Sequence, residues 1–98
     1  MYMKDKQTAE NKTHYWKRSP ITGRKYDYFD SDTIRIINFE QSFAYINAGV
    51  APLDIVMSTD RKNPSKKIVL FIFSRSETEE LYQLWCDGKL EKAPVIED

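Results

Sequence analysis

The feature that most constrains the fold is an unbroken apolar run, Ile68 to Phe73. A strand with one solvent-exposed face alternates apolar and polar residues, whereas a strand that is covered on both faces is apolar at every position. We therefore expect residues 67–73 to form a central strand of a sheet. Residues 53–58 alternate, with Leu53, Ile55 and Met57 on one face. A polar, basic loop at 59–65 separates the two segments, which predicts that they pair as a hairpin.

Two short helices flank this pair of strands. Asn38 is a suitable N-cap, Gln41 stands three places later as in a capping box, and Gly49 suits the left-handed end of a helix. For the second helix we expect Ser76 as the N-cap, with Glu79 completing its capping box. Apolar residues recur at helical spacing, so the helices should pack through Phe39, Phe43, Ile46, Leu81, Leu84 and Trp85.

Two aromatic-rich segments precede these elements. Residues 13–18 and 24–29 are strand-prone and are separated by a loop that contains Pro20 and Gly23, which predicts a β-hairpin. Residues 33–37 are a further β-branched strand. The predicted fold is α+β, with a small antiparallel or mixed sheet, two helices, the order ββ–β–α–β–β–α and an N-terminal aromatic hairpin. Residues 13–90 are the single domain, 1–12 a flexible tail and 91–98 an acidic tail.

Length and composition limit the class of protein. A chain of 98 residues has room for one core. Its zero net charge hides segregation, because residues 1–25 and 60–75 are basic whereas 26–59 and 76–98 are acidic. Such segregation helps to select partners. The longest apolar run is too short for a membrane span, and the N-terminus lacks the apolar stretch of a signal peptide. We therefore expect a cytoplasmic protein without a membrane partner.

The sequence gives little support for catalysis. Cys86 is the one thiol and His14 the one histidine, so neither an internal disulfide nor a zinc site is expected. We interpret Cys86 as a buried or half-buried residue and Asp54 as an edge, turn or capping carboxylate. A metal-dependent nuclease would need a second acid on the next strand, which has none. The glycines are isolated, so no phosphate-binding loop is expected. We predict a protein that is not an enzyme and needs no cofactor or metal.

Binding is the remaining class of function, and the hairpin interleaves basic with aromatic residues. Single-stranded nucleic acid is one candidate ligand, because bases stack on aromatic rings while cations track phosphates. An acidic protein surface would suit the same strip. The segment Tyr26-Asp27-Tyr28-Phe29-Asp30 has two interpretations, as an acidic aromatic recognition strip or as a cover for the open sheet face. The predicted partner-binding residues are Tyr15, Trp16, Lys17, Arg18, Arg24, Lys25, Tyr26, Tyr28, Arg61 and Lys62.

Self-association is a third hypothesis. The side chains of the central strand project from two faces, and two helices would cover one of them. A homodimer could bury the other face if the hairpin does not.

Residues 33–90 resemble a small, functionally uncharacterised domain family of phages and conjugative elements of low-GC Gram-positive bacteria. The resemblance rests on Ile36-Ile37-Asn38, Ala44-Tyr45-Ile46-Asn47-Ala48-Gly49-Val50, Pro52-Leu53-Asp54-Ile55, Leu70-Phe71-Ile72-Phe73, Ser76-Glu77-Thr78-Glu79-Glu80-Leu81-Tyr82 and Trp85. It implies a mobile-element origin and no particular activity. The basic hairpin lies outside it, and added segments on a shared scaffold often carry the particular function.

We therefore expect a non-enzymatic phage or mobile-element protein that acts by protein–protein binding in the cytoplasm of a bacterial host. By analogy with other small phage proteins, an inhibitor of a host defence complex such as a CRISPR effector nuclease is the leading hypothesis. The alternative is a nucleic-acid-binding accessory or regulatory protein of a mobile element.

Overall fold

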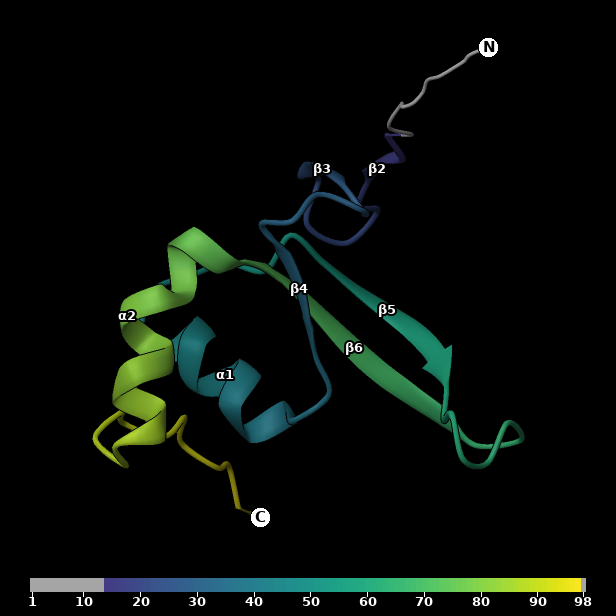
Figure 1. Ribbon diagram of the computed structural model, residues 1–98. Helices are drawn as coiled ribbons and strands as arrows, with labels where there is room; N and C mark the ends of the chain where they lie inside the picture. Colours follow the sequence, from purple (N-terminus) through teal and green to yellow (C-terminus); the bar gives the residue numbers. More distant parts are fainter. Residues whose placement is uncertain (1–13, 98) are drawn as a thin grey trace, which may run out of the picture.

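The computed structural model describes residues 14–97, which adopt an α+β fold (Figure 1). The order of elements agrees with the sequence prediction, and the predicted fold class is confirmed. The tail predicted for residues 1–12 lies outside the described residues, and residues 91–97 contain neither helix nor strand. The elements are β2 (Trp16–Arg18), β3 (Lys25–Asp27), β4 (Thr33–Ile36), α1 (Phe39–Asn47), β5 (Asp54–Thr59), β6 (Lys67–Ser74) and α2 (Arg75–Cys86).

The apolar run forms β6, the middle strand of a three-stranded sheet in the order β4–β6–β5. Both pairings are antiparallel, and Phe71 stands opposite Ile36 on one side and Ile55 on the other. The sheet is therefore antiparallel throughout rather than mixed. β2 and β3 form a separate antiparallel pair, which is the predicted hairpin.

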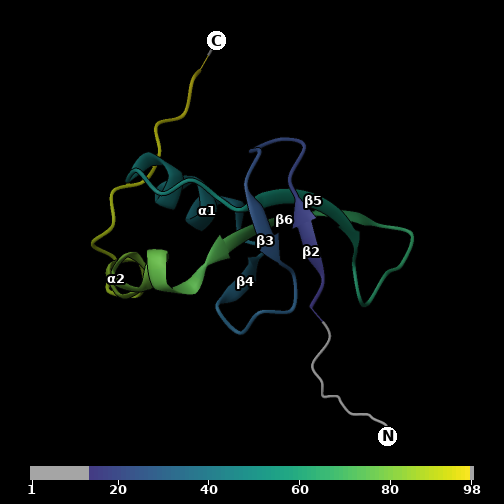
Figure 2. The same cartoon turned by 90° about the horizontal axis from the view of Figure 1, so that it is seen from above.

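The two faces of the sheet are covered by different parts of the chain. Phe71 and Phe73 face the helices, where Tyr45 of α1 is fully buried against them. Ile72 faces the opposite way and packs with Tyr26 of the hairpin. Figure 2 shows the hairpin crossing the strands, with both helices away from it. Cover on both faces explains why the consecutive residues Phe71, Ile72 and Phe73 are all apolar, whereas Val69, nearer the β5–β6 loop, is 49% exposed. It also removes the premise of the dimer hypothesis, because the hairpin covers the face that had been left open.

The first helix begins as predicted, but the second begins two residues earlier. Asn38 accepts a hydrogen bond from the Gln41 backbone N–H, which confirms it as the N-cap of α1. The N-cap of α2 is Ser74 rather than Ser76, and its hydroxyl accepts from the Glu77 N–H at 3.4 Å. The reason is that β6 runs directly into α2 without a loop, so the last strand residue is also the cap.

The predicted packing of the helices is only partly correct. Ile46, Leu81 and Trp85 join the core, but Phe39 is 64% exposed, Phe43 47% and Leu84 38%. Tyr45 takes the central place instead, with its ring edge-to-face on Phe73 at 5.3 Å between centroids. The small neighbours Ser42 and Ala44 are fully buried and let α1 approach the sheet closely. The helix is therefore turned so that Phe43 only reaches the edge of the core.

Three smaller expectations also need correction. Leu53 does not share a face with Ile55, because it lies just before β5 and packs with the hairpin side of the core. Met57 is 71% exposed, since α1 does not reach that end of the sheet. Cys86 is exposed rather than buried, because it follows Trp85 directly on α2, and Trp85 is the residue there that packs on the core.

Candidate binding surface on the N-terminal hairpin

The turn between β2 and β3 is stabilised from within. The Ser19 N–H donates to the Arg24 carbonyl, and the Gly23 N–H donates to the Ser19 carbonyl, both at 2.9 Å. The Ser19 hydroxyl accepts from the backbone N–H groups of Ile21 and Thr22. Gly23 has a φ of 76°, a left-handed conformation that glycine adopts without steric cost. These hydrogen bonds within the hairpin fix the shape of its turn.

A buried hydrogen bond joins the hairpin to the sheet. The Tyr26 hydroxyl donates to the Asp54 carboxylate at 2.6 Å, and Asp54 is only 2% exposed. Burial would raise the pKa of Asp54, but hydrogen bonds from the Ser19 and Tyr26 hydroxyls outweigh it, so this pKa is lowered. Burial, followed by the bond to Asp54, raises the pKa of Tyr26. The buried carboxylate that accepts from Tyr26 ties the hairpin to the sheet.

Further contacts surround this bond. The Thr22 hydroxyl donates to the Leu53 carbonyl at 2.8 Å. Arg24 donates to the Ala51 carbonyl at 2.9 Å and pairs with Glu77 of α2 at 3.0 Å. Each of these contacts links residues far apart in the sequence. The hairpin is therefore held by the sheet and by the start of α2.

The other end of the hairpin is tied by Asp27. Its carboxylate accepts from the backbone N–H groups of Tyr15 and Phe29, both at 3.0 Å, and contacts Nδ1 of His14 at 2.5 Å. The bond to His14, followed by the backbone bonds, lowers the pKa of Asp27. Asp27 is 5% exposed, whereas the His14 side chain is 61% exposed, so the backbone bonds are better shielded from water than the bond to His14.

The outer side of the hairpin carries exposed aromatic rings. Trp16 is 57% exposed and stacks on His14 at 6.0 Å between ring centroids. The ammonium of Lys25 lies 5.6 Å from the centre of the Trp16 ring, within the range of a cation–π contact. Phe29 and Tyr15 are also more than half exposed. We call Tyr15, Trp16, Arg18, Lys25 and Phe29 the hairpin surface.

The structure divides the predicted binding residues into groups. Tyr26 is buried in the docking contact, and Arg24 is engaged with Glu77. Lys17 lies over the rings of Tyr15 and Tyr28, at 5.7 and 5.8 Å, so its charge faces its own aromatic residues. The members that remain accessible on the hairpin are Tyr15, Trp16, Arg18 and Lys25.

Arg61 and Lys62 do not extend this surface. They follow Thr59 at the far end of β5, whereas the hairpin contacts Asp54 at its start. A strand rises about 3.4 Å per residue, so these ends are about 17 Å apart. Figure 1 places the loop at the end of the β5–β6 ribbon opposite the hairpin.

Asp54 was not predicted as part of this unit, whereas Asp27 and Phe29 lie in the segment 26–30, for which a recognition strip or a sheet cover was predicted. A lone acid beside the apolar positions of a strand was the available signal for Asp54, because a buried carboxylate needs donors. Phe29 is exposed because it lies in the turn after β3.

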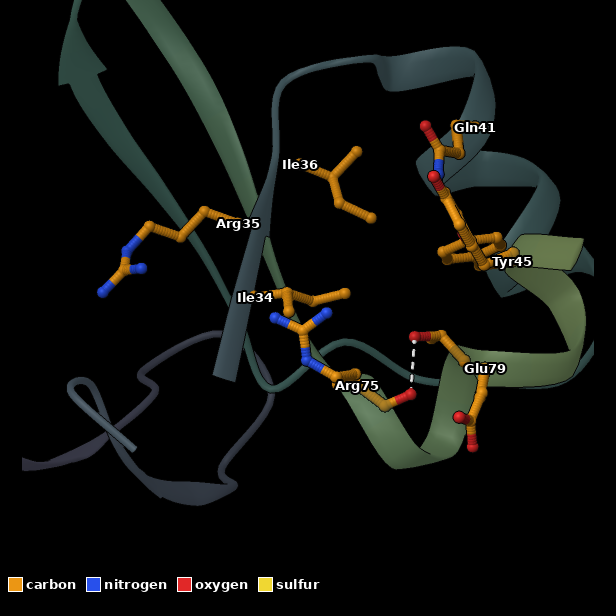
Figure 3. Close-up of a pocket in the computed structure, with 9 residues that line it drawn as sticks. Ile34, Arg35, Ile36, Gln41, Tyr45, Arg75 and Glu79 are labelled. Atoms are coloured by element: carbon orange, nitrogen blue, oxygen red, sulfur yellow. Dashed lines mark hydrogen bonds between the residues drawn. The ribbon is translucent and has the colours of Figure 1, made fainter. Parts of the chain in front are cut away.

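A cavity of about 380 Å³ lies between β4 and the two helices. Figure 3 shows Ile34 and Ile36 pointing from β4 toward Tyr45, whereas Arg35 points away from them. The polar groups of its lining include no thiol and no imidazole. They are Arg35, Gln41, Tyr45, Arg75, Thr78, Glu79 and Tyr82.

The lowered carboxylate pKa values give a pH prediction. Hydrogen bonds, led by that from Ser74, lower the pKa of Asp32, as other bonds do for Asp27 and Asp54. A lowered folded-state pKa stabilises the protein above the unfolded value of about 3.9, and this stabilisation is lost as the pH falls through the folded values. We expect the free energy of unfolding, measured with urea, to fall steeply below about pH 4. Asp54→Asn should make this fall shallower. An unchanged dependence of the free energy of unfolding on pH would show that Asp54 does not contribute to it.

Within residues 14–97, no group of three or more His, Cys, Asp or Glu side chains is placed to hold a metal ion. No helix in the described range is long and apolar enough to cross a membrane. Comparison with known proteins found no matching family model, no matching curated protein and no matching solved structure.

Proposed function

We propose that this protein has no chemistry of its own and binds a partner protein through the hairpin surface. The observation that carries the proposal is the exposed ring of Trp16 on a hairpin fixed to the sheet by the buried Tyr26–Asp54 bond. Tryptophan, tyrosine and arginine dominate the energetics of protein interfaces. A side chain that is already held in place also loses less entropy on binding, which favours affinity.

The charges of the hairpin surface favour an acidic partner. Arg18 and Lys25 stand opposite each other in the β2–β3 register, two positions from Trp16 on the side of the turn. They would steer an acidic surface toward the aromatic rings and speed its encounter. We propose inhibition by occlusion, in which the bound hairpin covers a working surface of the partner. In the same proposal the protein belongs to a phage or mobile element, and its partner is a host defence complex such as a CRISPR effector nuclease.

Nucleic-acid binding has less support from the arrangement of the cations. A single strand needs cations spaced along a groove beside free ring faces. In the hairpin, Lys17 covers rings of its own chain and Arg24 is paired with Glu77. Trp16 stacks on His14. The loop that carries Arg61 and Lys62 lies at the other end of the sheet, so within residues 14–97 no continuous basic track joins this loop to the hairpin.

The test is an affinity pull-down from nuclease-treated lysate of a low-GC Gram-positive host, read by mass spectrometry. The wild-type protein should retain one stoichiometric protein partner. The variant Trp16→Ala should lower the affinity for it by at least about tenfold, which is about 1.4 kcal/mol. Arg18→Glu with Lys25→Glu should slow association and weaken the salt dependence.

The matched control is Lys89→Glu, a charge reversal on an exposed residue beyond α2, away from the hairpin. It should bind as the wild type does. Loss of every partner after nuclease treatment would move the nucleic-acid hypothesis to first place. Equal binding by wild type and Trp16→Ala would refute the assignment to the hairpin surface.

A further inference from the structure

An exposed apolar patch lies on the helix side of the sheet, away from the hairpin. Met57 and Val69 stand opposite each other on β5 and β6, and both are about half exposed or more. Val69 shares its face of β6 with Phe71, and Phe71 contacts the ring of Phe43 at 5.4 Å. Phe39 precedes Phe43 by one turn of α1. We call Phe39, Phe43, Met57 and Val69 the α1 patch.

Charges of opposite sign lie at the two ends of this patch. The β5–β6 loop beyond Met57 and Val69 is basic, through Arg61, Lys62, Lys66 and Lys67. At the other end of α1, Ala48 and Val50 share a hollow of about 310 Å³ with the acidic first turns of α2, which supply Glu77, Glu79 and Glu80. Figure 1 shows α1 beginning on the side of the loop and ending beside α2. Among the described residues, none of the four loop cations is in an ion pair.

This arrangement is complementary to itself. We propose that the α1 patch is the interface of a homodimer, in which a two-fold axis brings the α1 helices together. Each basic loop would then meet the acidic start of α2 in the other copy. Closed dimers use the same surface on both partners, so a patch with opposite charges at its two ends suits a second copy. A partner surface of a single charge would repel either the basic loop or the acidic start of α2.

The size of the interface is feasible. A stable interface buries about 800 Å² on each partner. The described residues expose 6938 Å² in total, so the dimer needs roughly a ninth of this surface. Phe39 and Met57 alone are 64% and 71% exposed. Solvent-exposed apolar area of this kind, rimmed by charge, is typical of interaction sites.

The dimer would leave the hairpin surface free. The hairpin covers the opposite face of the sheet from α1, as the two core clusters show. A dimer would therefore present two copies of the hairpin surface, which raises the avidity for any partner with two sites. The inference does not rest on the proposed function, because self-association is measured on the purified protein alone.

The experiment is sedimentation velocity on the full chain over a range of micromolar concentrations. Wild-type protein should sediment as a dimer, and Phe39→Lys should weaken the dimer by at least about tenfold. The matched control is Ile21→Lys, which places the same charge on an equally exposed residue of the hairpin loop. It should leave the dimer unchanged.

A charge swap distinguishes this specific interface from non-specific association. Lys62→Glu with Lys66→Glu should weaken the dimer, and so should Glu79→Lys with Glu80→Lys. All four substitutions in one chain should restore it, because each loop then meets a helix of opposite charge again. A monomer at every concentration, or a fourfold variant that stays monomeric while its circular dichroism is native, would overturn the proposal.

Discussion

Replacement of Phe73 with alanine is expected to lower the free energy of unfolding by about 4 kcal/mol. Phe73 is fully buried in the central strand and packs edge-to-face on Tyr45. Its removal loses the burial of the ring and leaves a cavity between β6 and α1 that small neighbours cannot fill. Total stability of small domains is about 5–15 kcal/mol, so the variant should lose between about a quarter and most of it. Urea unfolding followed by circular dichroism measures the change.

Phe39→Ala is the matched control, because it removes the same ring from an exposed site at the start of α1. In dilute, monomeric protein it should change the free energy of unfolding by less than about 1 kcal/mol. Similar losses for the two variants would show that Phe39 is in the core, as the sequence pattern predicts, and would contradict the orientation of α1.

Asp54→Ala is expected to cost about 3 kcal/mol, because it leaves the Tyr26 hydroxyl and the Ile55 backbone N–H without their acceptor. The loss should fall mainly on the hairpin, which depends on this carboxylate, rather than on the β4–β6–β5 sheet. Hydrogen exchange should therefore show faster exchange for the amides of β2 and β3 than for those of β6. Any partner binding through Trp16 should weaken as well, since its support becomes mobile.

Tyr26→Phe tests the same bond from the other side. It removes only the hydroxyl and keeps the ring against Ile72 and Leu53, so we expect about half the loss of Asp54→Ala. Uniform acceleration of exchange in β2, β3 and β6 would show that the hairpin and the sheet unfold as one unit. Unchanged exchange in the hairpin would contradict the role given to Asp54.

The sequence predicts the order of elements well because each has a strong local signal. The run Ile68 to Phe73 identifies the central strand, and Asn38 identifies the start of α1. The face that α1 buries is not predictable in this way, because two stripes of the helix are apolar enough. Phe39 and Phe43 form the more hydrophobic stripe, but Tyr45 reaches Phe73 while its small neighbours allow a close approach. That choice depends on the shape of the sheet.

The candidate site shows the same limit. Sequence alone predicts an aromatic, basic hairpin, and the structure contains it. Which cations remain available is decided by contacts over long separations, such as that of Arg24 with Glu77. The local sequence pattern also does not indicate that the Tyr26 hydroxyl donates a hydrogen bond to Asp54, 28 residues away. The predicted residues therefore include several that hold the hairpin rather than face a partner.

The position of β6 in the chain has a consequence for synthesis of the protein. β6 is the middle strand of the sheet but the last strand in sequence, so β4 and β5 have no neighbour until it exists. As the chain leaves the ribosome, α1 and the two outer strands emerge without a surface to pack on. The sheet can close only after residue 74 has emerged, and contacts that span so much of the chain form slowly. A nascent chain stopped before residue 67 would therefore expose its apolar residues to chaperones and proteases.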